Sequence, residues 1–139
     1  MPTTSDTVFY DGGCALCHFY VRILVAFDRD GSRFRFAPIG GALFRALLAE
    51  DQRAGLPDAI AVRTADGRLL VRSAAALRLG ARLGGLHGAL ARVLAYVPAR
   101  LRDRIYDVIA RSRYRLFGRV SETCPVIAPE LRARFDLRP

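Results

Sequence analysis

The segment from Val8 to His18 constrains the fold of this chain more than any other part. It reads Val-Phe-Tyr-Asp-Gly-Gly-Cys-Ala-Leu-Cys-His, so a short apolar run ends at two glycines and is followed at once by two cysteines. Phe9 and Tyr10 favour extended backbone, the glycines permit a sharp turn, and the apolar residues from Leu16 onward recur at helical spacing. The sequence therefore predicts a strand, a tight turn and a helix that starts at the first cysteine.

The two cysteines occupy different positions in this predicted helix. Cys14 falls in or just before the first turn, where unpaired backbone N–H groups and the positive end of the helix dipole favour a thiolate. Cys17 follows on the same helical face, within disulfide reach but better shielded. An exposed, acidified thiol beside a buried partner is what thiol–disulfide exchange needs, with Cys14 attacking and Cys17 resolving the mixed disulfide.

Three other interpretations of these cysteines remain open. Cys14, Cys17 and His18 also spell the C-x-x-C-H signature of c-type haem attachment, although haem needs an axial partner and usually export. A zinc site could combine Cys14, Cys17, Cys124 and a histidine, but the sequence offers no second close-spaced ligand pair. Both cysteines could also be structural, since free cysteines are commonly buried. The strand before the motif and the helix after it favour the redox dithiol.

Composition places the motif in one domain. With 139 residues and 52% hydrophobic content, the chain can bury a core without disulfide staples, and three cysteines do not fit a secreted disulfide scaffold. Residues 1–6 show no export signal, and the longest apolar stretch, 16–27, is too short to span a bilayer. We therefore expect a single soluble, cytoplasmic domain over residues 1–139, in which the dithiol rests reduced.

Positive charge is concentrated towards the C-terminus. The formal charge is +9, and all 22 basic residues are arginine. Residues 1–97 hold 12 arginines against 8 acidic residues, whereas residues 98–139 hold 10 against 5. No nucleic-acid motif accompanies this excess, so nucleic acid is not an expected partner. The arginines form either a solvated helix face or a functional face that binds an acidic partner or anionic lipid.

The first part of the chain predicts a parallel β-α-β unit. A strand over 7–10, a helix from 14 or 15 to 28 and a strand over 32–37 follow one another. Two strands joined by a helix of this length lie parallel, with a right-handed crossover. A second, weaker helix is predicted over 41–50.

An antiparallel hairpin and a further helix come next. Strands over 59–63 and 69–72 flank Asp66-Gly67, which is a strong hairpin signal. Ser73 is a suitable N-cap for a helix over 74–83. Together these elements give the order β-α-β-α-β-β-α.

The last part of the chain is predicted to be helical. One helix runs over 86–97 to Pro98, which suits the first position of the next helix. That helix ends at Gly118 and carries an apolar stripe that we expect to pack on the core: Leu101, Ile105, Val108 and Ile109. The predicted organisation is a core over about 7–83 and a C-terminal helical hairpin over about 86–135, within one domain.

This order of elements resembles the α/β thioredoxin-like core of the glutaredoxin type, with a four-stranded mixed sheet and flanking helices. The residues from Tyr10 to Cys17 resemble the Asp-x-x-Cys-x-x-Cys signature of the DCC family of putative thiol-disulfide oxidoreductases. Residues of the C-terminal part resemble that family's pattern as well: Pro98, Arg102, Asp103, Tyr106, Arg111, Arg113, Tyr114, Phe117, Gly118 and Cys124. The resemblance implies the fold and a redox class, but no substrate.

The carboxylate of Asp11 admits three roles. Close to Cys14 it would raise the thiol pKa, whereas directed at Cys17 it could act as the base that deprotonates the resolving thiol. It could also cap the turn by accepting backbone N–H bonds. We take Cys14, Cys17 and Asp11 as the candidate catalytic residues, and expect His18 at the helix edge and Cys124 packed in the tail.

The thioredoxin-like resemblance also implies a substrate groove. Such proteins place a cis-proline before the third strand, facing the dithiol, and Pro57 stands at that place, although an ordinary trans-proline remains open. Tyr10 and Gly13 complete the expected substrate-contacting residues. The expected partner is a thiol or disulfide substrate, either a protein or a glutathione-like molecule, and we expect no cofactor and no metal.

A different class of function remains open beside the enzyme. In this alternative the chain is a thioredoxin-like binding module, its cysteines are structural, and the basic C-terminal helices recognise an acidic partner. The accessibility of the Cys14 sulfur distinguishes the two, because it should be open if it reacts and sealed if it packs.

Overall fold

Four strands form a mixed sheet at the centre of the computed structural model, which describes residues 5–56, 60–120 and 129–138. The sheet has the order β2-β1-β3-β4, with β1 parallel to β2 and antiparallel to β3, and β3 antiparallel to β4. This is the predicted thioredoxin-like sheet. Its strands are β1 (Asp6–Tyr10), β2 (Phe34–Pro38), β3 (Ala61–Arg63) and β4 (Leu69–Val71).

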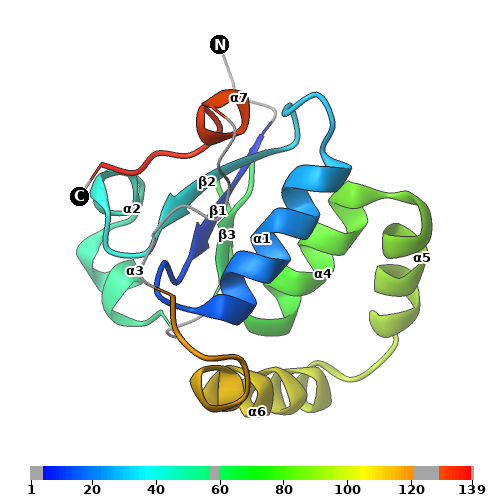
Figure 1. Cartoon of the computed structure of the whole chain (residues 1–139). Coiled ribbons are helices and arrows are strands. Elements are labelled where there is room, and N and C mark those ends of the chain that lie inside the picture. Colours follow the sequence, from blue (N-terminus) through cyan, green and yellow to red (C-terminus); the bar gives the residue numbers. More distant parts are fainter. Residues whose placement is uncertain (1–4, 57–59, 121–128, 139) are drawn as a thin grey trace.

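Helices cover both faces of the sheet (Figure 1). The helices α1 (Ala15–Phe27) and α4 (Arg72–Leu83) lie side by side on one face, and α2 (Ala42–Leu47) and α3 (Glu50–Ala54) lie on the other. Side chains alternate along each strand, so Val8 packs beneath α1 and α4 while its neighbour Phe9 packs against α2. The result is a three-layer α/β/α arrangement.

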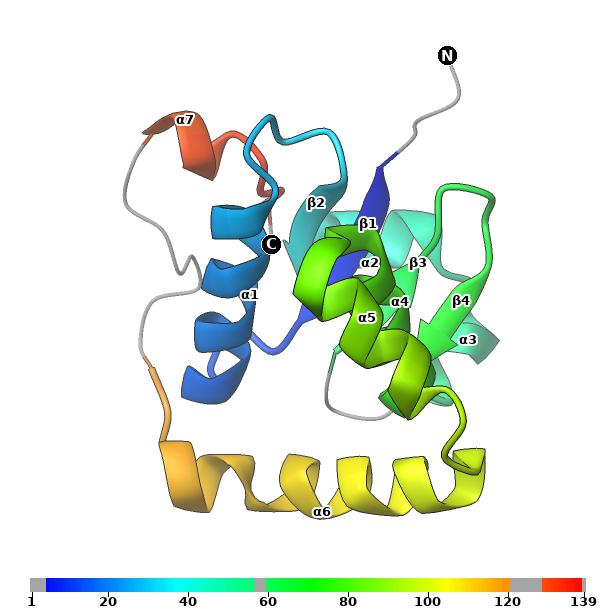
Figure 2. The ribbon, with the colours of Figure 1, turned by 90° about the vertical axis from the view of Figure 1, so that its right-hand side faces the viewer.

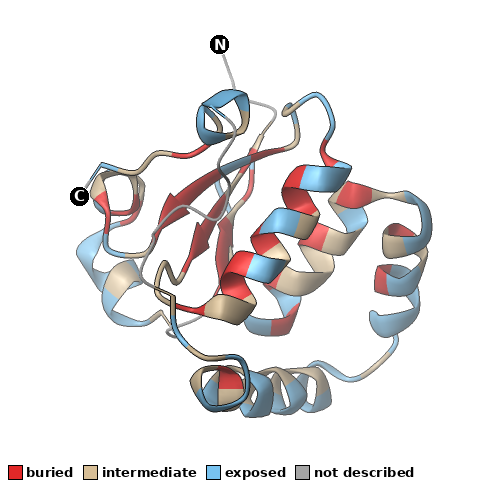
Figure 3. Cartoon of the chain, viewed as in Figure 1, coloured by how far each residue is buried: buried red, intermediate tan, exposed pale blue. Residues whose placement is uncertain are grey.

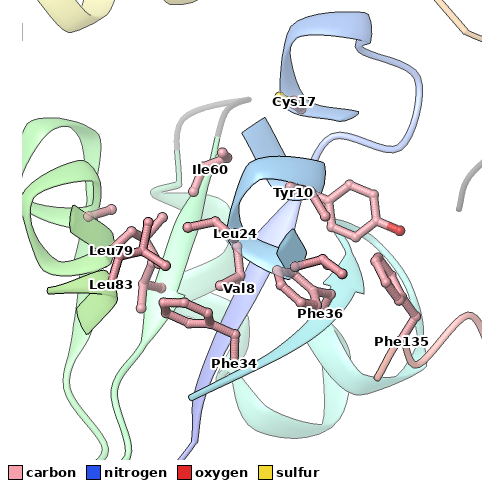
Figure 4. Packing of buried hydrophobic residues seen from close by; sticks show 14 of the residues in the cluster. Val8, Tyr10, Cys17, Leu24, Phe34, Phe36, Ile60, Leu79, Leu83 and Phe135 are labelled. Carbon is pink, nitrogen blue, oxygen red and sulfur yellow. The ribbon is translucent and has the colours of Figure 1, made fainter. Parts of the chain in front are cut away.

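The larger core lies beneath α1 and α4 (Figure 4). Leu24 of α1 and Leu79 of α4 are fully buried against the aromatic residues of β2. Beside them, the buried carboxylate of Asp6 accepts hydrogen bonds from the guanidinium of Arg78 at 2.8 and 3.1 Å and from the backbone N–H of Ala65 at 3.0 Å. This buried charge is therefore paired, as a buried carboxylate must be.

The helix predicted over 41–50 is divided in two. It stops after Leu47 because Leu48 turns into extended backbone and is itself buried against the sheet. A new helix begins at Glu50, where the side-chain oxygen of Gln52 accepts the backbone N–H of Ala49 at 3.0 Å. The weak periodicity over this stretch did not show the break.

The three remaining helices are α5 (Gly85–Leu94), α6 (Ala99–Phe117) and α7 (Pro129–Arg132). The predicted C-terminal hairpin needs a correction, because its two helices pack on different parts of the core. Helix α5 lies along α4, whereas α6 crosses the ends of α1 and α4 where these helices begin (Figure 2). The chain after α7 then returns to the outer strand, where Phe135 pairs with Phe36.

Helix α6 does not present its apolar stripe to the core. The side chains of Leu101, Ile105, Val108 and Ile109 are all about half exposed (Figure 3 shows α6 mostly pale blue). Its polar side faces inward because Asp103 accepts hydrogen bonds from the Ser73 hydroxyl at 2.5 Å and from the Ser73 backbone N–H at 3.3 Å. The carboxylate thus caps α4, which begins one residue before Ser73, where Ser73 itself was expected to be the cap.

Candidate functional site

The two cysteines lie at the start of α1, as predicted. Cys14 is the N-cap residue, and its Sγ accepts a hydrogen bond from the backbone N–H of Cys17 at 3.4 Å. The turn before it is closed by the N–H of Cys14 donating to the carbonyl of Asp11 at 3.2 Å. This turn leads from β1 directly into α1 and places both cysteines at one helix terminus.

Both thiols are buried and neither is in a disulfide bond. Cys14 has no exposed surface and Cys17 is 4% exposed, so the expected exposure of Cys14 is wrong. The segment that covers Cys14 is residues 118–120, which follow α6 and pair with residues 13–15 as a neighbouring strand would. Ala15 N–H donates to the carbonyl of Gly118 at 3.2 Å, and Val120 N–H donates to the carbonyl of Gly13 at 3.0 Å.

A cluster of four side chains holds this cover in place, and we call it the clasp: Asp11, Arg113, Tyr114 and Arg119. One oxygen of Asp11 accepts the backbone N–H of Gly13 at 3.0 Å, and the other accepts the Arg113 guanidinium at 3.2 Å and the Tyr114 hydroxyl. The guanidinium groups of Arg113 and Arg119 lie over the Tyr114 ring, 4.5 and 3.8 Å from its centre. Asp11 therefore caps the turn and ties it to the end of α6.

The environment of Cys17 keeps its sulfur protonated. Burial, the adjacent Cys14 sulfur and its hydrogen bond, and the Asp11 charge together raise the pKa of Cys17 from 9.0 to about 12. Burial also raises the pKa of Tyr106, on the facing side of α6, to about 12, with Cys17 contributing. Cys17 is thus a thiol at neutral pH. This state suits a resolving thiol, which reacts only after a mixed disulfide has formed.

Tyr10 and His18 pack in the interior. Tyr10 has no exposed surface, and its ring lies edge-on to those of His18 and Phe135, each 6.0 Å away between centres. The substrate-contacting role predicted for Tyr10 is therefore corrected to a core role, since the apolar periodicity of β1 turns this side chain inward. His18 is also buried, and its Nε2 lies 2.8 Å from the carbonyl oxygen of Gly12.

The remaining predicted residues lie either in the covered turn or outside the described residues. Gly13 lies in the turn, with its carbonyl bonded to Val120 and its N–H bonded to Asp11. Pro57 and Cys124 lie outside the described residues, so the groove role of Pro57 stays a prediction. Among residues 5–56, 60–120 and 129–138, no three His, Cys, Asp or Glu side chains gather as metal ligands.

The clasp is the part of the site that sequence reasoning did not assign. Arg113 and Tyr114 stand more than 100 positions from Asp11, and no local pattern links an acidic residue in a turn to the end of a distant helix. Both residues belong to the C-terminal pattern that resembles the DCC family, and this was the sequence signal that could have pointed to them.

In the described part of the chain, no helix has both the length and the apolar character needed to cross a membrane.

Comparisons with known proteins place this part of the chain in a family. The model of the DCC1-like thiol-disulfide oxidoreductase family matches residues 8–119, which include both cysteines and the whole clasp. The chain is 31% identical to the uncharacterized protein YuxK of Bacillus subtilis over 132 residues, covering 92% of this chain and 91% of YuxK. It is 32% identical to a chloroplastic DCC family protein of Arabidopsis thaliana over 119 residues, covering 84% and 67%. No solved structure shows a significant match. From the first strand to the clasp, the chain belongs to the DCC1-like thiol-disulfide oxidoreductase family.

Proposed function

We propose that the chain exchanges disulfides through Cys14 and Cys17, with Cys14 as the nucleophile and Cys17 as the resolving thiol. The observation that carries this proposal is the position of Cys14 at the N-cap of α1, where the N–H of Cys17 donates to its sulfur. The Cys14 sulfur thus lies at the helix terminus with a backbone N–H directed at it. Because the pKa of Cys17 is high, we assign the resolving role to Cys17 and the role of nucleophile to Cys14.

The exchange proceeds in two displacement steps. The Cys14 thiolate attacks one sulfur of a substrate disulfide, which forms a mixed disulfide and releases the first substrate sulfur as a thiolate. Cys17 then loses its proton and attacks the Cys14 sulfur, which releases the second substrate sulfur. The substrate disulfide is reduced to two thiols, which take up the two protons, and the Cys14–Cys17 pair is oxidised to a disulfide. Asp11 is the candidate base for the second step.

Access to Cys14 requires the covering segment to move. Residues 118–120 are held to the turn by two backbone hydrogen bonds and by the clasp. None of these contacts belongs to the sheet, so the segment can separate from the turn without unfolding the sheet. We propose a protein or glutathione-like thiol or disulfide as the substrate. A reducing compartment such as the cytoplasm would keep the resting pair as a dithiol.

Burial of Cys14 also favours a second candidate function. In it the cysteines are structural, and the chain is a binding module whose basic helix α6, with six arginines against two aspartates, recognises an acidic partner. The two functions differ in whether the pair has a measurable redox equilibrium.

The test is equilibration of the chain in glutathione buffers of graded potential. After acid quenching, mass spectrometry should show one transition in which the chain loses two hydrogens and the disulfide maps to Cys14 and Cys17. Cys124→Ser is the matched control, because it removes a cysteine but leaves the pair. A pair that stays reduced in the most oxidising buffer would favour the binding module.

A further inference from the structure

Helix α6 forms one outer side of the molecule. It is 19 residues long, and no other described element lies beyond it in Figure 2, where it runs along the bottom. Its inner side is occupied by contacts with the rest of the chain, since Asp103 accepts hydrogen bonds from Ser73 and Arg113 donates to Asp11. The opposite side of the helix, which we call its outer side, faces the solvent.

The apolar stripe of α6 lies on this outer side and is continued by Leu116. Its members recur at spacings of three or four residues, so they share one side of the helix from its first turn to its last. They are between 49% and 70% exposed: Leu101, Ile105, Val108, Ile109 and Leu116. Soluble domains rarely leave a contiguous apolar patch exposed unless it is an interaction site.

A row of three exposed arginines runs beside the stripe, and we call it the arginine row: Arg104, Arg111 and Arg115. Arg104 stands three residues after Leu101 and four before Val108, and Arg111 stands three residues after Val108. Residues at these spacings are neighbours on a helix surface. The outer side of α6 therefore divides lengthwise into an apolar half and a basic half.

The acidic residues of α6 do not neutralise the arginine row. Asp103 is bound to Ser73 on the inner side, and Asp107 forms an ion pair with Arg72 of α4, with 3.4 Å between nitrogen and oxygen. Within the part of the chain that the structure describes, no ion pair reaches the arginine row. The row thus leaves its positive charge for a partner outside the chain.

The surface of an anionic lipid bilayer matches both halves. A helix that lies in a membrane interface buries apolar side chains among the acyl chains and directs basic side chains at the phosphates, and it needs no groove in its partner. A second copy of the chain would cover the stripe, but it also carries a charge of +9 and brings no unpaired carboxylate on its own α6. An acidic protein surface would neutralise the arginine row but leave the stripe uncovered.

We propose that the outer side of α6 binds the surface of a membrane that contains anionic phospholipids, with the helix axis parallel to the bilayer. The stripe would enter the boundary between headgroups and acyl chains, and the arginine row would contact the phosphates. The clasp belongs to the inner side of the same helix, so binding leaves its contacts intact. The proposal does not rest on the exchange reaction.

Flotation of the full chain with phosphatidylcholine vesicles, with or without about one third phosphatidylglycerol, tests the proposal. The chain should float with the anionic vesicles and bind the neutral ones at least tenfold more weakly. Salt at about 0.5 M should weaken binding to the anionic vesicles, because it screens the arginine row.

Two multiple variants test the two halves separately. Arg104→Gln/Arg111→Gln/Arg115→Gln removes the arginine row, and Leu101→Ser/Val108→Ser interrupts the stripe. Each should weaken binding to the anionic vesicles at least tenfold. Both should retain the circular dichroism spectrum of the wild type, because all five side chains are exposed.

The matched control removes three exposed arginines outside α6: Arg22→Gln/Arg29→Gln/Arg132→Gln. It lowers the net charge as much as loss of the arginine row does, and it should weaken binding less than threefold. Cys14→Ser should float as the wild type does, so a failure of the exchange chemistry does not affect this test.

Four results would overturn the proposal. They are absence of binding to either kind of vesicle, equal binding to both kinds, binding to anionic vesicles that the serine variant retains, and an equal loss of binding in the control. Binding to polyglutamate as tight as to the anionic vesicles would assign the surface to an acidic protein instead. A dimer in the absence of lipid that Leu101→Ser/Val108→Ser dissociates would assign it to a second copy.

Discussion

At the scale of single residues, the chain separates two neighbouring thiols by their surroundings. The Cys14 sulfur receives a backbone N–H at the helix terminus, whereas the Cys17 sulfur is surrounded by carbon and stands next to another sulfur. Asp11 adds a second level of control, because the same carboxylate shapes the turn and anchors the segment that covers it. In the proposed exchange, these few contacts would set both the reactivity of the dithiol and access to it.

Loosening the clasp should expose Cys14. Tyr114→Phe removes the hydroxyl that donates to Asp11, and a hydrogen bond to a charged group contributes about 1.5–3 kcal/mol. We expect Cys14 to be alkylated on the order of ten times faster near neutral pH, as followed by mass spectrometry. Tyr96→Phe, at a tyrosine that is 91% exposed, should leave the rate unchanged. Equal rates in both variants would show that the clasp does not control access.

Stability at alkaline pH should depend on Cys17. Its folded-state pKa lies above the ordinary value of 9.0, so the folded chain retains this proton where the unfolded chain loses it. The contribution of Cys17 to the free energy of unfolding is therefore complete below pH 9 and decreases as pH rises towards 12. Urea unfolding at pH 8 and 10.5 should show a smaller loss of stability in Cys17→Ser than in the wild type. An identical pH dependence would mean that the thiol is better solvated than its burial implies.

At the scale of elements, the sequence predicted what depends on local pattern. The apolar run of β1, the alternation along β2 and the Asp66-Gly67 turn predicted the strands of the sheet, and the motif predicted the start of α1. The orientation of α6 was not predictable from its stripe. Periodicity shows that a helix has an apolar side, but Asp103 and Arg113 form their contacts with residues far away in the chain, and these contacts turn the other side inward. The sequence does not predict the cover over Cys14 for the same reason, because its contacts join residues far apart in the chain.

The stripe of α6 should therefore contribute little to stability. Leu101→Ala or Ile105→Ala removes a side chain that is about half exposed, so we expect a loss of about 1 kcal/mol or less. Leu79→Ala, in the buried core, should cost about 2–5 kcal/mol and serves as the reference. Urea unfolding measures both. A loss of more than about 2 kcal/mol at Leu101 or Ile105 would place the stripe against the core.

At the scale of the whole molecule, the chain after the sheet closes the structure at two edges. Helix α6 and residues 118–120 close the end where α1 begins. The segment after α7 closes the outer edge of β2, where Phe36 N–H donates to the carbonyl of Arg134 at 3.0 Å and Asp136 N–H donates to the carbonyl of Phe36 at 2.8 Å. This pairing protects an otherwise open strand edge.

The C-terminal segment should accordingly stabilise the whole domain. Phe135 is 7% exposed and stacks on Phe36 with ring centres 4.9 Å apart. Phe135→Ala should lower the free energy of unfolding by about 3–5 kcal/mol and leave a single cooperative transition, because the lost contacts belong to the main core. Leu137→Ala, at a partly buried position, is the milder comparison. A separate early transition for the segment would contradict this assignment.

The asymmetry between the two cysteines is the central claim, and covalent trapping tests it most directly. Cys17→Ser retains the nucleophile but cannot resolve, so acid-quenched alkylation and non-reducing gels should show reducible adducts through Cys14. Cys14→Ser retains the buried Cys17 thiol, whose pKa burial raises, and should trap little or nothing. Both variants are made with Cys124→Ser, so that no other cysteine can form adducts. Adducts of Cys17→Ser alone would confirm the assigned roles, whereas equal trapping by the two variants, or adducts of Cys14→Ser alone, would contradict them.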